Sequence, residues 1–94
     1  MVTREQANDL VKYLTEQGIV GIELIGSLTK EKETKHDIDL FIPNADSFWQ
    51  RLEWLLSPTH VKKTDIGSYY FYGSLIAHSD VDIFPYDPRK KHKR

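Results

Sequence analysis

Apolar residues near the start of the chain recur at the spacing of an α-helix. Their positions, three or four residues apart, put them on one helical face: Ala7, Leu10, Val11 and Leu14. The segment that begins at Thr3 has the form of a capping box, in which Thr3 caps the helix and Gln6 reaches back. Gly18 follows as a stop signal. The pattern predicts a helix of about four turns that packs its apolar face on the rest of the protein.

Two strands and a second helix are expected next. Residues 19–25 are rich in branched apolar side chains, and residues 37–42 alternate acidic and apolar side chains. Helical spacing then returns, with Asp46 or Ser47 as its N-cap and Ser57-Pro58 as its end. The apolar face of this second helix consists of Phe48, Trp49, Leu52, Leu55 and Leu56.

After Pro58 the pattern changes from helical to extended. Short strand-like runs occupy residues 61–66, 69–72, 75–77 and 81–84. The turns between them are Gly67-Ser68, Gly73-Ser74 and Ser79-Asp80. Cross-strand packing explains the aromatic run at residues 69–72, with a base-stacking platform as the alternative. The order helix, strand, strand, helix and strand meander predicts an α+β domain with a mixed or antiparallel sheet and helices on one face.

Length and composition narrow the class of protein. The 94 residues make one domain, placed at residues 1–86, and the 39% apolar content is that of a globular protein. Without cysteine the chain forms no disulfide, thiolate zinc site or cysteine nucleophile. The N-terminus lacks a signal-peptide pattern, and no apolar run reaches the roughly 18 residues of a membrane span. A soluble cytoplasmic protein with no membrane partner is therefore expected.

Positive charge gathers at the end of a chain whose net charge is −1. Residues 87–94 form a basic C-terminal tail, which contains Arg89, Lys90, Lys91, His92, Lys93 and Arg94. Such a run is usually a solvated, frayed terminus. The alternative is a contact for nucleic acid or for an acidic partner surface. The tail by itself indicates no function.

The most informative segment alternates acids with apolar residues at Asp37-Ile38-Asp39-Leu40. Because strand side chains alternate, Asp37 and Asp39 share one face. Two carboxylates about 5–7 Å apart repel each other by on the order of a few kcal/mol. Magnesium relieves this repulsion because it prefers hard oxygen ligands. The solvent-facing side of an edge strand is the alternative, although Phe41 on the same face argues against it.

A third acid repeats the pattern in residues 81–84, where Asp82 stands between branched apolar residues. If that strand lies beside residues 37–42, Asp82 completes a three-carboxylate cluster able to hold two metal ions. Asp82 is then the natural general base or metal-bound proton acceptor. Asp80 has the same side-chain parity but lies in the expected turn, so Asp82 is preferred.

Gly26 and Ser27 supply features of a phosphate site. Gly26 allows the backbone to approach a ligand closely, and Ser27 can open a short helix or turn through residues 28–32. Backbone N–H groups there, with the Ser27 hydroxyl, would bind β- and γ-phosphates. An ordinary turn is the alternative. Nearby residues that could add a phosphate contact, without a pattern that selects among them, are Lys30, Lys32, Lys35 and His36.

Together these segments resemble the signature of a known superfamily. Ile25-Gly26-Ser27, a nine-residue gap, Asp37-Ile38-Asp39-Leu40 and Val81-Asp82-Ile83 are similar to the DNA polymerase beta-like nucleotidyltransferases, especially the small stand-alone minimal nucleotidyltransferases. A lone Gly-Ser or Asp-x-Asp is weak, whereas the full string with its spacing is specific. The resemblance covers residues 19–84. It implies the nucleotidyltransferase fold, a mixed sheet flanked by helices.

The resemblance also implies an activity: magnesium-dependent transfer of a nucleoside monophosphate, usually AMP from ATP, to a hydroxyl. By position, Gly26 and Ser27 would hold the triphosphate. Asp37, Asp39 and Asp82 would be the catalytic residues and bind two Mg²⁺ ions. Minimal members are often paired with a helical HEPN-type toxin, which they adenylylate as antitoxins. A homodimer, a small-molecule hydroxyl, a nucleic-acid end and a non-catalytic nucleotide- or partner-binding module of the same fold remain alternatives.

Overall fold

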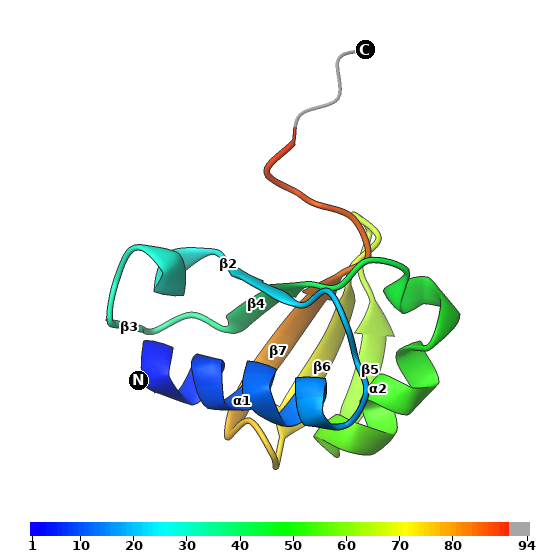
Figure 1. Ribbon diagram of the computed structural model, residues 1–94, viewed down its shortest axis with the longest axis horizontal. Coiled ribbons are helices and arrows are strands. Elements are labelled where there is room, and N and C mark those ends of the chain that lie inside the picture. The colour runs from blue at the N-terminus through cyan, green and yellow to red at the C-terminus, as the bar shows by residue number, and fades with distance from the viewer. Residues whose placement is uncertain (91–94) are drawn as a thin grey trace.

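The computed structural model describes residues 1–90 as an α+β fold, with a five-stranded mixed sheet and two α-helices (Figure 1). The elements in chain order are β1 (Val2–Thr3), α1 (Arg4–Glu16), β2 (Glu23–Ile25), the 3-10 helix η1 (Ser27–Thr29), β3 (Glu33–Thr34), β4 (Ile38–Phe41), the 3-10 helix η2 (Ala45–Ser47), α2 (Trp49–Leu56), β5 (His60–Lys63), β6 (Tyr69–Ser74) and β7 (Ser79–Phe84). The sheet order is β2-β4-β7-β6-β5, while β1 and β3 form a separate antiparallel pair. The predicted α+β class is confirmed.

The centre of the sheet is its one parallel pair within residues 1–90, β4 and β7. Parallel neighbours need a crossover, and here α2 and the strands β5 and β6 provide it. β5, β6 and β7 then form the expected antiparallel meander. This route returns the chain from the far edge of the sheet to the side of β4.

Alternation along the central strands divides the sheet into an apolar and a polar face. Ile38 and Leu40 of β4 and Val81 and Ile83 of β7 are fully buried in the main core. The helices cover this face with Ala7, Leu10, Leu14, Leu52, Leu55 and Leu56. Side chains that alternate with the core residues must point to the opposite face. That is the face of Asp39 and Asp82.

Helix α1 begins as predicted. The Thr3 hydroxyl accepts a hydrogen bond from the Gln6 N–H at 3.0 Å, and the Gln6 side-chain oxygen accepts one from the Thr3 N–H at 3.2 Å. Both halves of the capping box are therefore present. Gly18, with φ of +96°, follows the helix end in a conformation that favours glycine.

The predicted strand over residues 19–25 is too long. Gly21 has a φ of +76°, so the chain turns there and only Glu23–Ile25 pairs with β4. Ile19 is buried in the core before this turn, whereas Val20 is 77% exposed. The apolar content of the segment therefore reflects core packing around a turn as well as a strand.

The predicted N-caps of the second helix are also wrong. Residues 45–47 form a separate 3-10 helix, and Phe48 occupies the N-cap of α2 without a side-chain cap hydrogen bond. Asp46 instead accepts a hydrogen bond of 2.6 Å from the Tyr69 hydroxyl. The end is as expected, because Ser57 adopts a left-handed conformation immediately before Pro58.

Three features of the meander differ from the prediction. Residues 75–77 form a turn, in which the Ser74 hydroxyl donates to the Leu56 carbonyl and accepts from the Ala77 N–H. The pairs Gly73-Ser74 and Ser79-Asp80, expected as turns, are the last two residues of β6 and the first two of β7. β5 ends at Lys63, because residues 64–68 turn around a contact between the Thr64 and Ser68 hydroxyls.

Two further predictions concern membrane spans and the basic tail. No helix within residues 1–90 has the length and apolar character required to cross a bilayer. Of the basic tail, Arg89 and Lys90 belong to the described part, and the prediction for residues 91–94 lies outside it.

Candidate functional site

Asp39 and Asp82 lie directly opposite each other on the parallel strands β4 and β7. The prediction that the strand of Asp82 lies beside residues 37–42 is therefore confirmed. Both side chains are half-buried on the face of the sheet opposite the helices. Burial, followed by the negative charges of Asp82 and Asp37, raises the pKa of Asp39 to about 7. The negative charges of these carboxylates are therefore not fully compensated by their surroundings.

Asp82 has an unsatisfied oxygen. Its Oδ1 atom is buried and has no hydrogen-bond partner within residues 1–90. Burial raises the pKa of Asp82 and the charge of Asp37 adds to the rise, while the Ser68 hydroxyl acts in the opposite direction. A buried carboxylate oxygen without a partner is uncommon because its lost hydration is uncompensated. Its lone pairs are not engaged by any donor within residues 1–90.

Asp37, immediately before β4, is engaged by a tyrosine. The Tyr70 hydroxyl donates to Asp37 Oδ2 at 2.7 Å and lies 3.2 Å from Asp80 Oδ2. Tyr70 is paired with Asp82 across β6 and β7, so it lies on the acidic face. Burial and the hydrogen bond to Asp37 raise the pKa of Tyr70 well above its usual range. The phenol therefore stays protonated and bridges two of the acids.

From the sequence, Tyr70 is expected to take part in sheet packing or, as the alternative, in a base-stacking platform, and not to contact the acids. Its parity within the aromatic run puts Tyr70 and Tyr72 on one face and Tyr69 and Phe71 on the other. The sequence shows that alternation, but only the register between β6 and β7 shows which pair of aromatic residues shares a face with the acids. Asp80 is likewise engaged, since its Oδ1 accepts from the Gly73 N–H at 2.7 Å.

Gly26 touches the acidic cluster. It adopts a φ of +82°, and a Cβ at this position would lie 2.5 Å from Oδ2 of Asp39. Only a residue without a side chain fits there without a shift of the carboxylate. Gly26 therefore lies beside Asp39, whereas the role of the Gly26-Ser27 bend toward a nucleotide stays a prediction.

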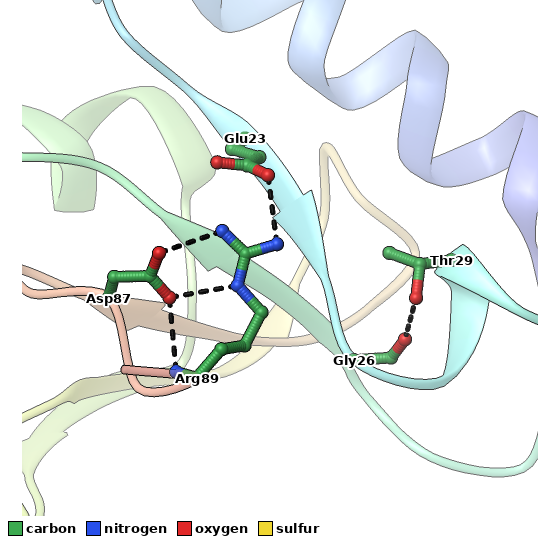
Figure 2. Close-up of polar contacts among 5 residues, drawn as sticks. All are labelled: Glu23, Gly26, Thr29, Asp87 and Arg89. Atoms are coloured by element: carbon green, nitrogen blue, oxygen red, sulfur yellow. Dashed lines mark hydrogen bonds and ion pairs between the residues drawn. The ribbon is translucent and has the colours of Figure 1, made fainter. Parts of the chain in front are cut away.

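A hollow of about 390 Å³ opens beside this bend. It is lined by Gly26, Ser27, Thr29, Lys30, Glu31 and Arg89. The Thr29 hydroxyl closes the bend by donating to the Gly26 carbonyl at 2.6 Å (Figure 2). The 3-10 helix η1 has only three residues, so any anion contact here would come from individual N–H groups and side chains rather than from a helix dipole.

The structure separates the four side chains considered as extra phosphate contacts. Lys30 lines the hollow, while Lys32, Lys35 and His36 are exposed and do not line it. Arg89 lines it as well, although the sequence analysis had grouped this residue with the solvated tail. No local signal distinguished Arg89, because its position depends on how the chain returns across β2.

Arg89 is fixed between two carboxylates (Figure 2). Its Nε and Nη2 atoms each lie 2.8 Å from an oxygen of Asp87, and Nη1 lies 2.9 Å from Oε2 of Glu23 on β2. The hydrogen bonds to Arg89 lower the pKa of Asp87 to about 2. The guanidinium is held as a fixed positive charge at the wall of the hollow.

The acidic side chains have the oxygen ligands that a hard cation prefers, but their arrangement is not that of a metal site. Within residues 1–90, no group of three or more His, Cys, Asp and Glu side chains is arranged to hold a metal ion. The Tyr70 hydroxyl engages Asp37, which limits the ligand set of the three predicted acids. The unpartnered Asp82 oxygen and the high pKa of Asp39 nevertheless mark carboxylates that a hard divalent cation would neutralise.

Comparisons with known proteins identify no relative: no family model matches the chain, and neither the curated proteins nor the solved structures contain a significant match.

Proposed function

We propose that this protein is a magnesium-dependent nucleotidyltransferase with the nucleotidyltransferase fold, which transfers AMP from ATP to a hydroxyl acceptor. The observation that carries the proposal is the pairing of Asp39 with Asp82 on adjacent parallel strands, beside Gly26. The resemblance of the Gly-Ser, Asp-x-Asp and third-acid segments to minimal nucleotidyltransferases supports the same function. The alternation that buries Ile38 and Leu40 in the core leaves the acids half-buried on the opposite face of the sheet.

The carboxylates would hold the metal and manage the proton. Asp37, Asp39 and Asp82 are the proposed ligands, and bound magnesium would supply neutralisation of the triphosphate charge. Asp37 would exchange its hydrogen bond from Tyr70 for this role. The raised pKa of Asp39 indicates that its carboxyl favours a proton, and a bound cation would replace that proton.

The transfer itself needs few groups. The acceptor oxygen bonds to the α-phosphorus while the bond from that phosphorus to the bridging oxygen breaks, and pyrophosphate leaves. Asp82 accepts the acceptor's proton, a role to which its unpartnered Oδ1 is suited. Gly26 and Ser27 would hold the triphosphate in line for attack, because positioning and charge neutralisation dominate this kind of chemistry.

The acceptor is proposed from the resemblance alone. A helical HEPN-type partner would present the hydroxyl to the polar face, as in antitoxin-type minimal nucleotidyltransferases. A small-molecule hydroxyl or a nucleic-acid end would use the same phosphoryl chemistry.

Calorimetry with ATP, in the presence and absence of Mg²⁺, tests the site directly. Wild-type protein should bind ATP at least about tenfold more tightly with Mg²⁺, and Asp39→Asn or Asp82→Asn should remove that difference. Asp9→Asn, the same change at an exposed position on α1, is the matched control. Transfer of α-phosphate label from ATP to protein, RNA and small-molecule fractions then tests catalysis.

A non-catalytic nucleotide-binding module of the same fold is the second candidate. The observation that favours it is that no ready-made metal-ligand group exists within residues 1–90. The two candidates make opposite predictions in the calorimetry. ATP binding that ignores both Mg²⁺ and the Asp39→Asn change would favour the module and reject the enzyme.

A further inference from the structure

The segment that follows β7 is anchored across the polar side of the sheet. The Tyr86 hydroxyl donates to the Ile66 carbonyl at 2.6 Å, and the Tyr86 ring packs edge-on against Phe84 with centroids 5.9 Å apart. Asp87 accepts from the Arg89 N–H at 3.0 Å, and Arg89 reaches Glu23 of β2. These contacts bring a side chain from the end of the described chain to the hollow beside Gly26.

The guanidinium of Arg89 retains donors for a ligand. Guanidinium has five N–H donors, and the contacts of Nε, Nη1 and Nη2 with Asp87 and Glu23 engage three of them. That leaves two donors without a partner among these contacts, on a side chain that is 48% exposed. Its carboxylate partners fix the orientation of the planar group, which reduces the entropy lost when a further anion binds.

The charges around the hollow nearly balance. Among its lining residues Lys30 and Arg89 are positive and Glu31 is negative, but Glu23 and Asp87 pair with Arg89, so these five side chains sum to one net negative charge. An anion would therefore be held by the remaining N–H donors of Arg89 and by Lys30, not by a net positive charge. Gly26, which lines the hollow, also lies beside the Asp39 carboxylate of the acidic cluster. A chain of phosphates that began at the acids could therefore extend past Gly26 toward Arg89.

We propose that Arg89 binds the terminal phosphates of the nucleoside triphosphate at the Gly26-Ser27 bend. This inference rests on the proposed function for the identity of the ligand. Arg89 is a binding residue for the leaving pyrophosphate portion, and it makes the site selective for triphosphates over monophosphates. Glu23 and Asp87 orient the guanidinium, and Lys30 adds the second positive charge on the facing turn.

Tripolyphosphate, in buffer that contains EDTA, is the direct probe because it needs neither metal nor nucleoside. Wild-type protein should bind it, and Arg89→Gln should weaken that binding by about tenfold. Binding of AMP should change by less than about twofold, because its single phosphate need not reach the hollow. Lys90→Gln removes the same charge from the neighbouring residue, which does not line the hollow, and should have little effect.

Glu23→Gln separates a phosphate contact from a purely structural ion pair. It removes one partner of Arg89 but keeps the guanidinium, so tripolyphosphate binding should be retained or become tighter. If Arg89 only fastened the segment to β2, Glu23→Gln and Arg89→Gln would weaken binding together, which would reject the inference. Urea unfolding of each variant identifies any loss caused by misfolding.

The outcomes distinguish this inference from the proposed function. If Mg²⁺-dependent ATP binding requires Asp39 but Arg89→Gln behaves like Lys90→Gln, the enzyme proposal stands and the role of Arg89 is wrong. If Arg89→Gln selectively weakens tripolyphosphate binding while Asp39→Asn changes neither Mg²⁺·ATP binding nor label transfer, the phosphate site stands without the enzyme. A wild-type protein that binds no tripolyphosphate would overturn the Arg89 site.

Discussion

At the scale of single residues, Gly26 connects the two halves of the candidate site. It lies beside the Asp39 carboxylate, and it also lines the hollow to which Arg89 belongs. A side chain at this position would meet Asp39 Oδ2 at 2.5 Å. The absence of a side chain thus has two consequences: a backbone conformation that L residues rarely adopt, and close contact between a bend and an acid.

Gly26→Ala should therefore lower the free energy of unfolding by about 1–3 kcal/mol, measured in urea, because strain and the clash with Asp39 add. Gly18→Ala is the matched control: its φ is also positive, at +96°, but an added Cβ meets nothing within 4 Å. It should be the milder change. Equal losses in the two variants would show that the contact with Asp39 carries no cost.

At the scale of elements, α1 is specified by its own sequence and attached by one of its capping residues. The Gln6 Oε1 atom accepts a hydrogen bond from the Thr3 N–H, and the Gln6 Nε2 atom donates one to the Ala77 carbonyl at 3.1 Å. The capping box therefore connects the helix start with the turn between β6 and β7. That turn positions β7, the strand of Asp82, so a local helix signal contributes to the geometry of the polar face.

Thr3→Ala should lower the free energy of unfolding by about 1 kcal/mol because the Gln6 N–H loses its acceptor. Thermal or urea unfolding measures this change. Thr15→Ala, at an exposed position in the last turn of α1, makes the same chemical change without loss of a cap and should be neutral or slightly stabilising. Similar losses at both positions would contradict the assigned role of Thr3.

At the scale of the whole molecule, stability and ligand binding are linked through the acids. The pKa of Asp39 rises from its ordinary 3.8 to about 7 in the folded protein. The folded state therefore holds this proton more tightly than the unfolded chain. The contribution of Asp39 to stability is most favourable below pH 4 and is lost as the pH rises through about 7.

Asp39→Asn should consequently be more stable than wild type at pH 8, by about 1–2 kcal/mol after allowance for solvent screening, and nearly equal to it at pH 4. Unfolding in EDTA at both pH values measures the difference. Mg²⁺ should stabilise the wild-type protein more at pH 8 than at pH 6, and it should not stabilise Asp39→Asn at either pH. A constant difference across this range would contradict the assigned pKa.

Local patterns were sufficient for several parts of this description. The capping box at Thr3 and Gln6 depends on contacts three residues apart, and the alternation from Asp37 to Leu40 determines which side chains share a face. These are properties of a few consecutive residues, so the sequence carries them without knowledge of the fold. The α+β class followed from the order of such segments.

What the sequence by itself determined was therefore the identity of the acids, their shared parity and the glycine-serine bend. Only the tertiary structure decided that Asp82 is opposite Asp39, that Tyr70 holds Asp37 and that Arg89 reaches Glu23. It also decided that Gly21 ends the pairing of the segment before β2. The physical reason is range: backbone preferences and periodicity act between near neighbours, whereas register and the return of a chain end depend on packing between distant segments.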